Sequence, residues 1–283
     1  MVRSGLMAHN KSLKKSNGEL GPSYVTFSGL VEDLRNESII MLQVSEDDYS
    51  EFAERALESG IEKGMLEREN LDSIFTNSKL RSSKMYTAFV NYYILRLTAV
   101  LELYFKDSIK QLLKLNIDLL VKGINGAENS ELVEKLDKNY DPKTYLGYLN
   151  RIATYYSCGK KFSGKYKKYS KFLEIEVSNT AILEKLDNLF SLRNDIAHLN
   201  RFSDDEINAG NRPELVTENG FKYSRETLLS REDFHEVIKT LINLTSETAK
   251  FLKDVEMEIN SKWAPRYESP KYHYTRLLKK LDQ

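Results

Sequence analysis

The sequence predicts an all-α protein that carries one small β-hairpin. Apolar residues recur at intervals of three or four over most of the chain, which is typical of amphipathic helices. Proline occurs at only 5 of 283 positions and charged residues make up 30% of the chain, a composition that suits long solvated helices. The segment 215–223 instead alternates around Asn219-Gly220, which is the strongest short-range signal for a hairpin.

The first 78 residues are expected to precede the main domain. Residues 1–20 combine lysine with serine, asparagine and glycine and contain no apolar run long enough for a signal peptide, which predicts a flexible tail. Residues 21–78 predict an N-terminal helical extension. Its first helix runs from Tyr24 to about Gln43, and Ser45 is suited to cap a second one.

The main helical domain is predicted over residues 79–260. Its first helix extends from Lys79 to Leu120 without proline or glycine, and we expect one break near Asn116. Asp141-Pro142 predicts another helix start, because proline is favoured at the first helical position. Further helices are expected over 130–139, from Asn179 and from Ser230 to about Asn260, and a basic, aromatic tail follows over 261–283.

Charge and cysteine content limit the classes of function. The 42 lysines and arginines balance the 42 acidic residues, so any attraction to nucleic acid must be local. Cys158 is the single cysteine and the four histidines are scattered, which argues against a zinc site. No window reaches the roughly 18 apolar residues that a membrane helix needs. We therefore expect a cytoplasmic protein with no cofactor and no membrane contact.

The segment from Leu192 to Asn200 brings Arg193, Asn194 and His198 together at the end of a helix. Arg193 falls on the apolar stripe, and the other two lie one turn apart beside it, so the three side chains can face one groove. A guanidinium binds phosphate oxygens through a fixed fork of donors, and a histidine moves protons at neutral pH. This chemistry suits metal-independent RNA cleavage, in which the ribose 2′-hydroxyl attacks the adjacent phosphate.

The run from Arg193 to His198 resembles the Arg-Asn-x-x-x-His motif of HEPN domains. These are all-helical modules that are often metal-independent ribonucleases of toxin–antitoxin, abortive-infection and CRISPR-associated systems. The segment from Tyr92 to Phe105 resembles the long first helix of the same module. The resemblance covers roughly residues 80–260, so the main domain over 79–260 is expected to be a HEPN-like helical bundle.

One position departs from a pattern within that family. Some antitoxin-paired members carry a tyrosine two residues after the histidine, whereas this chain has Asn200. Modification at that position is therefore not implied.

The resemblance implies a role for each of the three residues. Arg193 would grip the scissile phosphate, His198 would act as general acid or base, and Asn194 would orient the imidazole or bind the phosphate. It also implies RNA as the substrate, a homodimer with one composite site, and an antitoxin or defence-system partner protein. Two other interpretations stay open: a non-catalytic HEPN-like scaffold that only binds RNA, a nucleotide or a protein, and a structural protein in which Arg193 pairs with Glu184 or Asp187.

A second candidate region lies between Gly159 and Lys171, which contains no acidic residue. Its lysines attract phosphate, and the rings interleaved among them can stack on bases, so either an RNA-guiding surface or a solvated lysine loop is expected. The spacing Gly159-x-x-x-x-Gly164-Lys165 imitates a phosphate-binding loop, but Tyr166 stands where the magnesium-binding hydroxyl residue is needed. The candidate RNA-binding residues are Lys160, Lys161, Lys165, Lys167 and Lys168.

Two further side chains have open roles. Glu102 lies within the apolar face of the first long helix, where it can pair with Arg96 or Arg193, or be an ordinary exposed or paired glutamate. His235 lies beside the apolar stripe of the last long helix, where a lone histidine is more often a surface or core residue than a ligand.

Overall fold

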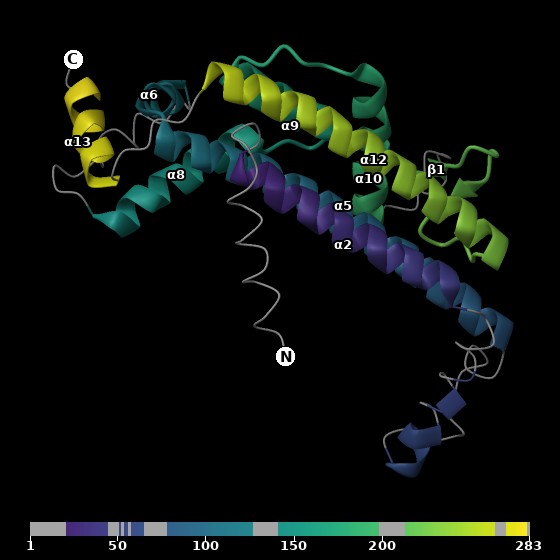
Figure 1. Ribbon diagram of the computed structural model, residues 1–283. Helices are drawn as coiled ribbons and strands as arrows, with labels where there is room; N and C mark the ends of the chain where they lie inside the picture. Colours follow the sequence, from purple (N-terminus) through teal and green to yellow (C-terminus); the bar gives the residue numbers. More distant parts are fainter. Residues whose placement is uncertain are drawn as a thin grey trace, which may run out of the picture. The chain divides into compact units, whose positions relative to one another are not determined.

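The computed structural model describes residues 21–44, 51, 54–55, 58–64, 78–126, 141–197, 213–263 and 270–281 (Figure 1). These residues are mostly helical and include one two-stranded antiparallel sheet, which confirms the predicted all-α class with a small hairpin. The helices are α2 (Pro22–Gln43), α5 (Ser78–Leu115), α6 (Ile117–Gly126), α8 (Pro142–Ser157), α9 (Phe162–Leu173), α10 (Thr180–Ala197), α12 (Arg231–Lys262) and α13 (Pro270–Leu281), and the strands are β1 (Leu215–Val216) and β2 (Lys222–Tyr223).

Local capping residues set several helix boundaries where they were predicted. The side chains of Asp141, Asn179 and Ser230 accept hydrogen bonds from first-turn backbone N–H groups of α8, α10 and α12, at 2.9, 3.2 and 3.1 Å. Asn116 separates α5 from α6, and its side chain caps α6 by accepting from the N–H of Leu119 at 3.1 Å. The expected break near Asn116 is therefore confirmed. The suggested cap at Ser45 and the helix expected over 130–139 lie outside the described residues.

Two helices occupy segments in which no helix was expected. α9 covers most of the lysine-rich stretch, and α13 covers much of the C-terminal tail. In α9, Phe162, Tyr166, Tyr169 and Leu173 are all buried, which is the spacing of one helical face. That spacing is present in the sequence, but the many lysines between these residues hide it. In α13, Tyr274 and Leu277 are the buried pair.

The described chain forms two compact units. Unit 1 consists of Met1–Gly29, Val100–Leu183 and Thr248–Gln283, and unit 2 consists of Leu30–Ala99 and Glu184–Glu247. The division into a tail, an extension, a HEPN-like domain and a second tail stays a prediction.

Aromatic rings and one buried carboxyl group form the core of unit 1. Phe105 of α5 lies against Phe162 of α9, with ring centroids 5.3 Å apart. Glu256 of α12 accepts hydrogen bonds from the Tyr104 hydroxyl at 2.8 Å and from the Gly21 N–H at 3.0 Å. Burial raises the pKa of Glu256, although these two donors oppose the rise. The network ties the segment that begins α2 to α5 and α12.

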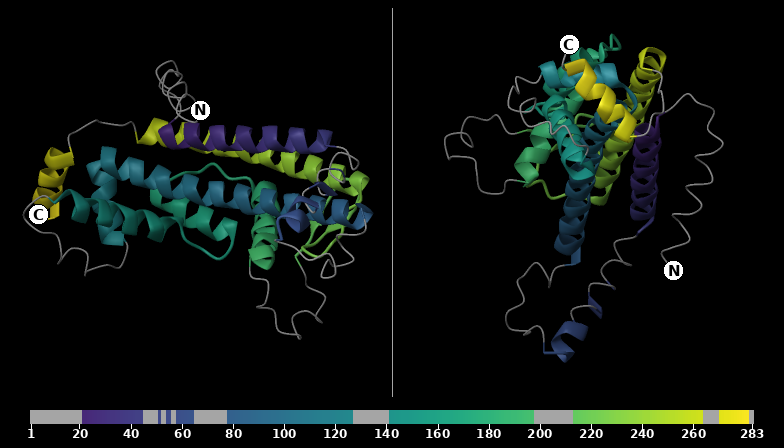
Figure 2. Two further views of the ribbon diagram at one scale, coloured as in Figure 1. Left: turned by 90° about the horizontal axis from the view of Figure 1, so that it is seen from below. Right: turned by 90° about the vertical axis from the view of Figure 1, so that its left-hand side faces the viewer.

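Helix pairs complete unit 1. α8 packs against α9, and α13 packs against α6 (Figures 1 and 2). The Tyr145 ring on α8 meets the Tyr274 ring on α13 edge to face, with centroids 5.6 Å apart. An ion pair between Lys280 and Asp118 further joins α13 to α6. The C-terminal helix is thus an integral part of this unit.

Unit 2 is built around the first part of α5 and the first part of α12. Tyr86 and Phe234 stack with ring centroids 4.6 Å apart, and the hydroxyls of Tyr93 and Thr245 hydrogen-bond at 2.9 Å. These contacts hold the two helices together. An ion pair between Arg96 of α5 and Glu37 of α2 adds a third helix to this unit.

The hairpin was predicted from Asn219-Gly220 and is confirmed. Leu215 of β1 lies opposite Tyr223 of β2, and Gly220 adopts a positive φ of 85° in the turn between them. The buried Tyr223 hydroxyl donates to the Asn91 side-chain oxygen at 2.7 Å, which attaches the hairpin to α5. Burial raises the pKa of Tyr223, so this hydroxyl keeps its proton at neutral pH.

Candidate functional site

Arg193 and Asn194 lie in the last part of α10, and both side chains are half-buried. Arg193 Nη1 donates a hydrogen bond to Asn194 Oδ1 at 3.0 Å. On the same helix, Leu189, Leu192 and Ile196 are buried. The sequence places Arg193 on the apolar stripe, and the structure places it at the partly exposed margin of that stripe. This position avoids the large cost of burying an unpaired guanidinium.

The end of α10 is held by Arg225, which lies between β2 and α12. Arg225 Nη1 donates to the backbone carbonyl of Asp195 at 3.1 Å, and it lies 3.7 Å from the Asp195 carboxylate. Asp195 itself is only 7% exposed. The last carbonyls of a helix lack partners within the helix, so an arginine here satisfies one of them and suits the negative end of the helix dipole.

Arg225 was not identified from the sequence as a residue that supports the site. The contact joins positions 30 residues apart in the sequence, and no local pattern signals it. It becomes apparent only when the hairpin is placed beside α10.

His198 lies outside the described residues, because the described part of α10 ends at Ala197. The expected grouping of Arg193, Asn194 and His198 in one groove therefore stays a prediction. The structure describes the first two of the three residues and brings their side chains into direct contact.

The lysines of the second candidate region divide into two sets. Lys160, Lys161, Lys167 and Lys168 are exposed on α9 and on the loop before it. Lys165 is 7% exposed and forms an ion pair with Glu102 of α5. It therefore serves the packing of unit 1, and the exposed lysines form a surface without it.

The aromatic rings between these lysines do not have the suggested role of stacking on bases. Phe162, Tyr166, Tyr169 and Phe172 are all buried, with exposed fractions of 3% or less. The Tyr166 hydroxyl donates to the backbone carbonyl of Val177, and burial raises the pKa of Tyr166. The rings are buried because the 3.6-residue period of α9 turns them inward together with Lys165, and it turns Lys167, Lys168 and Lys171 outward.

Glu102 is a paired glutamate, which was one of the alternatives that the sequence left open. It pairs with Lys165, whereas Arg96 pairs with Glu37, so the suggested pair of Arg96 and Glu102 was wrong. Tertiary packing decides between such alternatives, because Glu102 and Lys165 lie 63 positions apart in the sequence.

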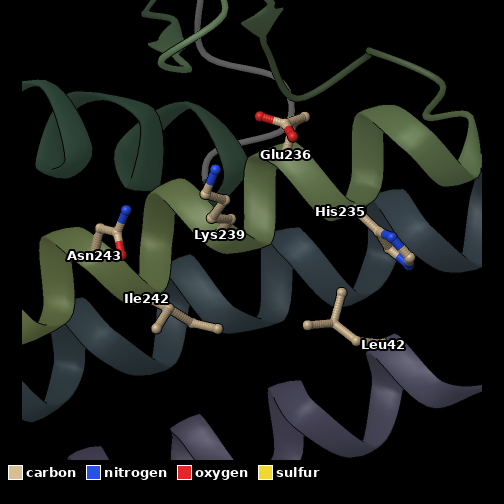
Figure 3. Close-up of a pocket in the computed structure, with 6 residues that line it drawn as sticks. All are labelled: Leu42, His235, Glu236, Lys239, Ile242 and Asn243. Atoms are coloured by element: carbon tan, nitrogen blue, oxygen red, sulfur yellow. The ribbon is translucent and has the colours of Figure 1, made fainter.

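Unit 2 also contains an open pocket of about 360 Å³ between α12 and α2 (Figure 3). His235 and Leu42 face it from the two helices. His235 is half-buried, and its ring centroid lies 6.1 Å from that of Phe234. The other residues that line the pocket are Glu236, Lys239, Ile242 and Asn243. Lys239 and Asn243 both contact Glu218, so the polar side of the pocket is occupied by internal contacts.

Within the described ranges, no group of three or more histidine, cysteine, aspartate or glutamate side chains is placed to hold a metal ion. Among those same residues, no helix has both the length and the apolar character required to cross a bilayer. Comparisons with protein-family models, with curated proteins and with solved structures found no match to this chain.

Proposed function

We propose that this protein is a metal-independent endoribonuclease of the HEPN type, in which Arg193, Asn194 and His198 form the reacting site. The observation that carries the proposal is the hydrogen bond between Arg193 and Asn194 near the end of α10. It joins two of the three motif residues, and the third follows the last described helical residue, Ala197, directly in the sequence.

The proposed reaction needs only the RNA and protein side chains. The ribose 2′-oxygen attacks the adjacent phosphorus, a new 2′-O–P bond forms, and the bond from phosphorus to the 5′-oxygen breaks. The 2′-hydroxyl gives its proton to a base, and the departing 5′-oxygen receives one. Arg193 stabilises the charge on the phosphate oxygens, and His198 transfers one of the two protons.

The second proton-transfer group would come from a second copy of the chain. One copy supplies one histidine to the site, and a two-fold axis near the end of α10 would supply another His198. We therefore propose a homodimer with one composite site. The resemblance favours a toxin or an antiviral effector in the cytoplasm, with an antitoxin or a defence-system protein as partner.

Matched histidine variants test the proposal. We expect His198→Ala to lower the rate of RNA cleavage by at least about 100-fold, because a positioned general acid or base typically contributes that much. RNA binding should persist in this variant. His235→Ala is the control, since His235 is half-buried on α12 and belongs to the pocket rather than to the motif. Equal cleavage by His198→Ala and His235→Ala would rule out the proposed mechanism.

Arg193→Ala separates catalysis from a purely structural role. The ribonuclease proposal predicts a loss of cleavage of about 100-fold or more, because the charge that develops on the phosphate loses its partner. The structural interpretation predicts a lower free energy of unfolding and no cleavage by the wild type. Urea denaturation and a cleavage assay on the same preparations distinguish these outcomes.

A further inference from the structure

The pair of helices α8 and α9 is strongly basic in a chain that has no net charge. From Pro142 to Leu173 the sequence contains lysine and arginine but no aspartate or glutamate. Seven cations lie exposed along the pair and in the loop between its helices. Lys143 lies in the first turn of α8 and interacts with the capping carboxylate of Asp141. The other six are Arg151, Lys160, Lys161, Lys167, Lys168 and Lys171. We call these six the α8–α9 basic face. Within the described part of the chain, no acidic side chain forms an ion pair with any of the six.

The two helices present these cations on one continuous surface. α8 and α9 pack together (Figure 2). Lys168 of α9 lies over the ring of Tyr155 of α8, with its Nζ 5.1 Å from the ring centroid, and Arg151 stands one helical turn before Tyr155. On α9, Lys167 and Lys171 share the exposed side with Lys168, because residues three and four apart lie on one face.

We propose that the α8–α9 basic face binds the phosphate backbone of an RNA strand. Exposed lysines that form no ion pair with an acidic side chain attract phosphates, whose binding releases counterions, and this attraction does not depend on base sequence. The rings of α9 are buried, so the face offers charge rather than stacking. The choice of RNA over other polyanions rests on the proposed ribonuclease function.

The chemistry of the exposed side disfavours a lipid surface. A helix that lies on a membrane inserts a face of large apolar side chains. Between Pro142 and Leu173, Leu146 is the one large apolar side chain that is exposed. Tyr155 and Tyr156 are half-buried, and the other large apolar side chains of α8 and α9 are buried in unit 1. Little remains to enter a bilayer, whereas a hydrated phosphodiester backbone requires only the cations.

A salt titration with matched variants tests this proposal. The full chain carrying His198→Ala is titrated into a fluorescent oligouridine of about 20 nucleotides between about 50 and 200 mM salt, and binding is followed by anisotropy. In this background, the substitutions Lys160→Gln, Lys161→Gln, Lys167→Gln and Lys171→Gln are combined. We expect at least tenfold weaker binding and a salt dependence that is shallower by about 0.7 logarithmic units for each phosphate that the variant no longer neutralises.

Two controls keep the result specific. Glutamine at Lys84, Lys114, Lys250 and Lys253, which are exposed on α5 and α12, removes the same charge elsewhere and should leave affinity within about twofold. In the second control, arginine replaces lysine at the four positions of the test variant, which we call the α9-region positions: Lys160, Lys161, Lys167 and Lys171. This variant keeps the positive charge and should bind oligouridine as tightly as the parent. Equal affinity of the two glutamine variants would overturn the proposal. So would binding to phosphatidylserine vesicles without binding to oligouridine.

The result of this binding experiment can be distinguished from the result of the cleavage experiment that tests the proposed function. Selective loss of oligouridine binding in the α9-region variant supports the basic face even if the wild-type protein cleaves no RNA. The same four glutamine substitutions are also made in the protein with His198 intact. Unchanged cleavage there, together with unchanged oligouridine binding in the His198→Ala background, would support the ribonuclease and reject this face.

Discussion

Arg225 shows how one side chain can fix the end of a helix that carries a candidate site. It reaches α10 from the loop that follows β2, and it donates a hydrogen bond to the backbone carbonyl of Asp195 in the last described turn of the helix. The motif residues Arg193 and Asn194 precede Asp195 directly, so the position of their backbone depends on this contact.

Replacing Arg225 should destabilise unit 2. We expect Arg225→Gln to lower the free energy of unfolding by about 1–2 kcal/mol, because a largely buried carbonyl loses a charged donor. Urea denaturation followed by circular dichroism measures this change. Arg151→Gln, at an exposed position on α8, is the matched control and should change stability by less than about 0.5 kcal/mol. Equal stability of the two variants would show that Arg225 does not hold α10.

Two glycines differ in whether the backbone conformation at their position requires glycine. Gly220 has a φ of 85°, which favours glycine strongly over residues with a Cβ atom. Gly147 lies inside α8, and a Cβ atom built on it would meet nothing within 4 Å. The same substitution should therefore have opposite effects in the two elements.

Gly220→Ala should lower the free energy of unfolding by about 1–2 kcal/mol, since an L-residue with positive φ brings its Cβ close to the backbone. Gly147→Ala should instead raise it by about 0.5–1 kcal/mol, because alanine favours a helix interior over glycine. Both changes are measured by urea denaturation. A stabilising effect at Gly220 would contradict the turn described here.

The free energy of unfolding should depend on pH through Glu256, the carboxyl group that joins α12 to the start of α2. Glu256 is 3% exposed, and burial raises its pKa above the usual 4.5. A raised folded-state pKa means that the folded protein binds this proton more tightly than the unfolded chain does. The contribution of the protonated Glu256 to the free energy of unfolding is therefore fully present below about pH 4.5. It is lost as pH rises through the folded-state pKa.

Glu256→Gln should remove this dependence, because the amide stays neutral. Its oxygen can still accept from the Gly21 N–H, and its NH2 group can donate to the Tyr104 hydroxyl oxygen in place of the present bond. The wild type should lose up to about 1.4 kcal/mol per pH unit in that window relative to the variant. Urea midpoints between about pH 4 and 7.5 measure the difference. The exposed Asp254 on the same helix provides the control Asp254→Asn. Parallel pH profiles of wild type and Glu256→Gln would show that this carboxyl group does not set the dependence.

Elements were predictable from the sequence where the signal is local. The caps at Asp141, Asn179 and Ser230 and the hairpin turn at Gly220 each lie within a few residues of the boundary that they set. α9 was missed because its charged side chains dominate the composition of the segment, although Phe162, Tyr166 and Tyr169 carry the helical spacing. In such a segment, the positions of the apolar residues are a better guide than their number.

Across the whole chain, the contacts between distant charged residues could not be predicted. The pairs Glu102–Lys165 and Arg225–Asp195 form only when the helices pack. The sequence offers several arginines and lysines as possible partners for each carboxylate and does not distinguish among them. The equal numbers of acidic and basic residues likewise conceal the concentration of positive charge on α8 and α9. Arg193 and Asn194 could be singled out from the sequence because the proposed HEPN-like pattern is short and local, and their role in a site stays a prediction.

The proposed function requires that the Arg193–Asn194–His198 motif cleaves RNA without a metal, and the ends of the products reveal whether it does. RNA is incubated with the 283-residue chain in EDTA, and the termini are identified by mass spectrometry. We expect cleavage that leaves 2′,3′-cyclic phosphate and 5′-hydroxyl ends and that disappears in His198→Ala. Products with 5′-phosphate ends, or cleavage that EDTA abolishes, would contradict the proposed reaction.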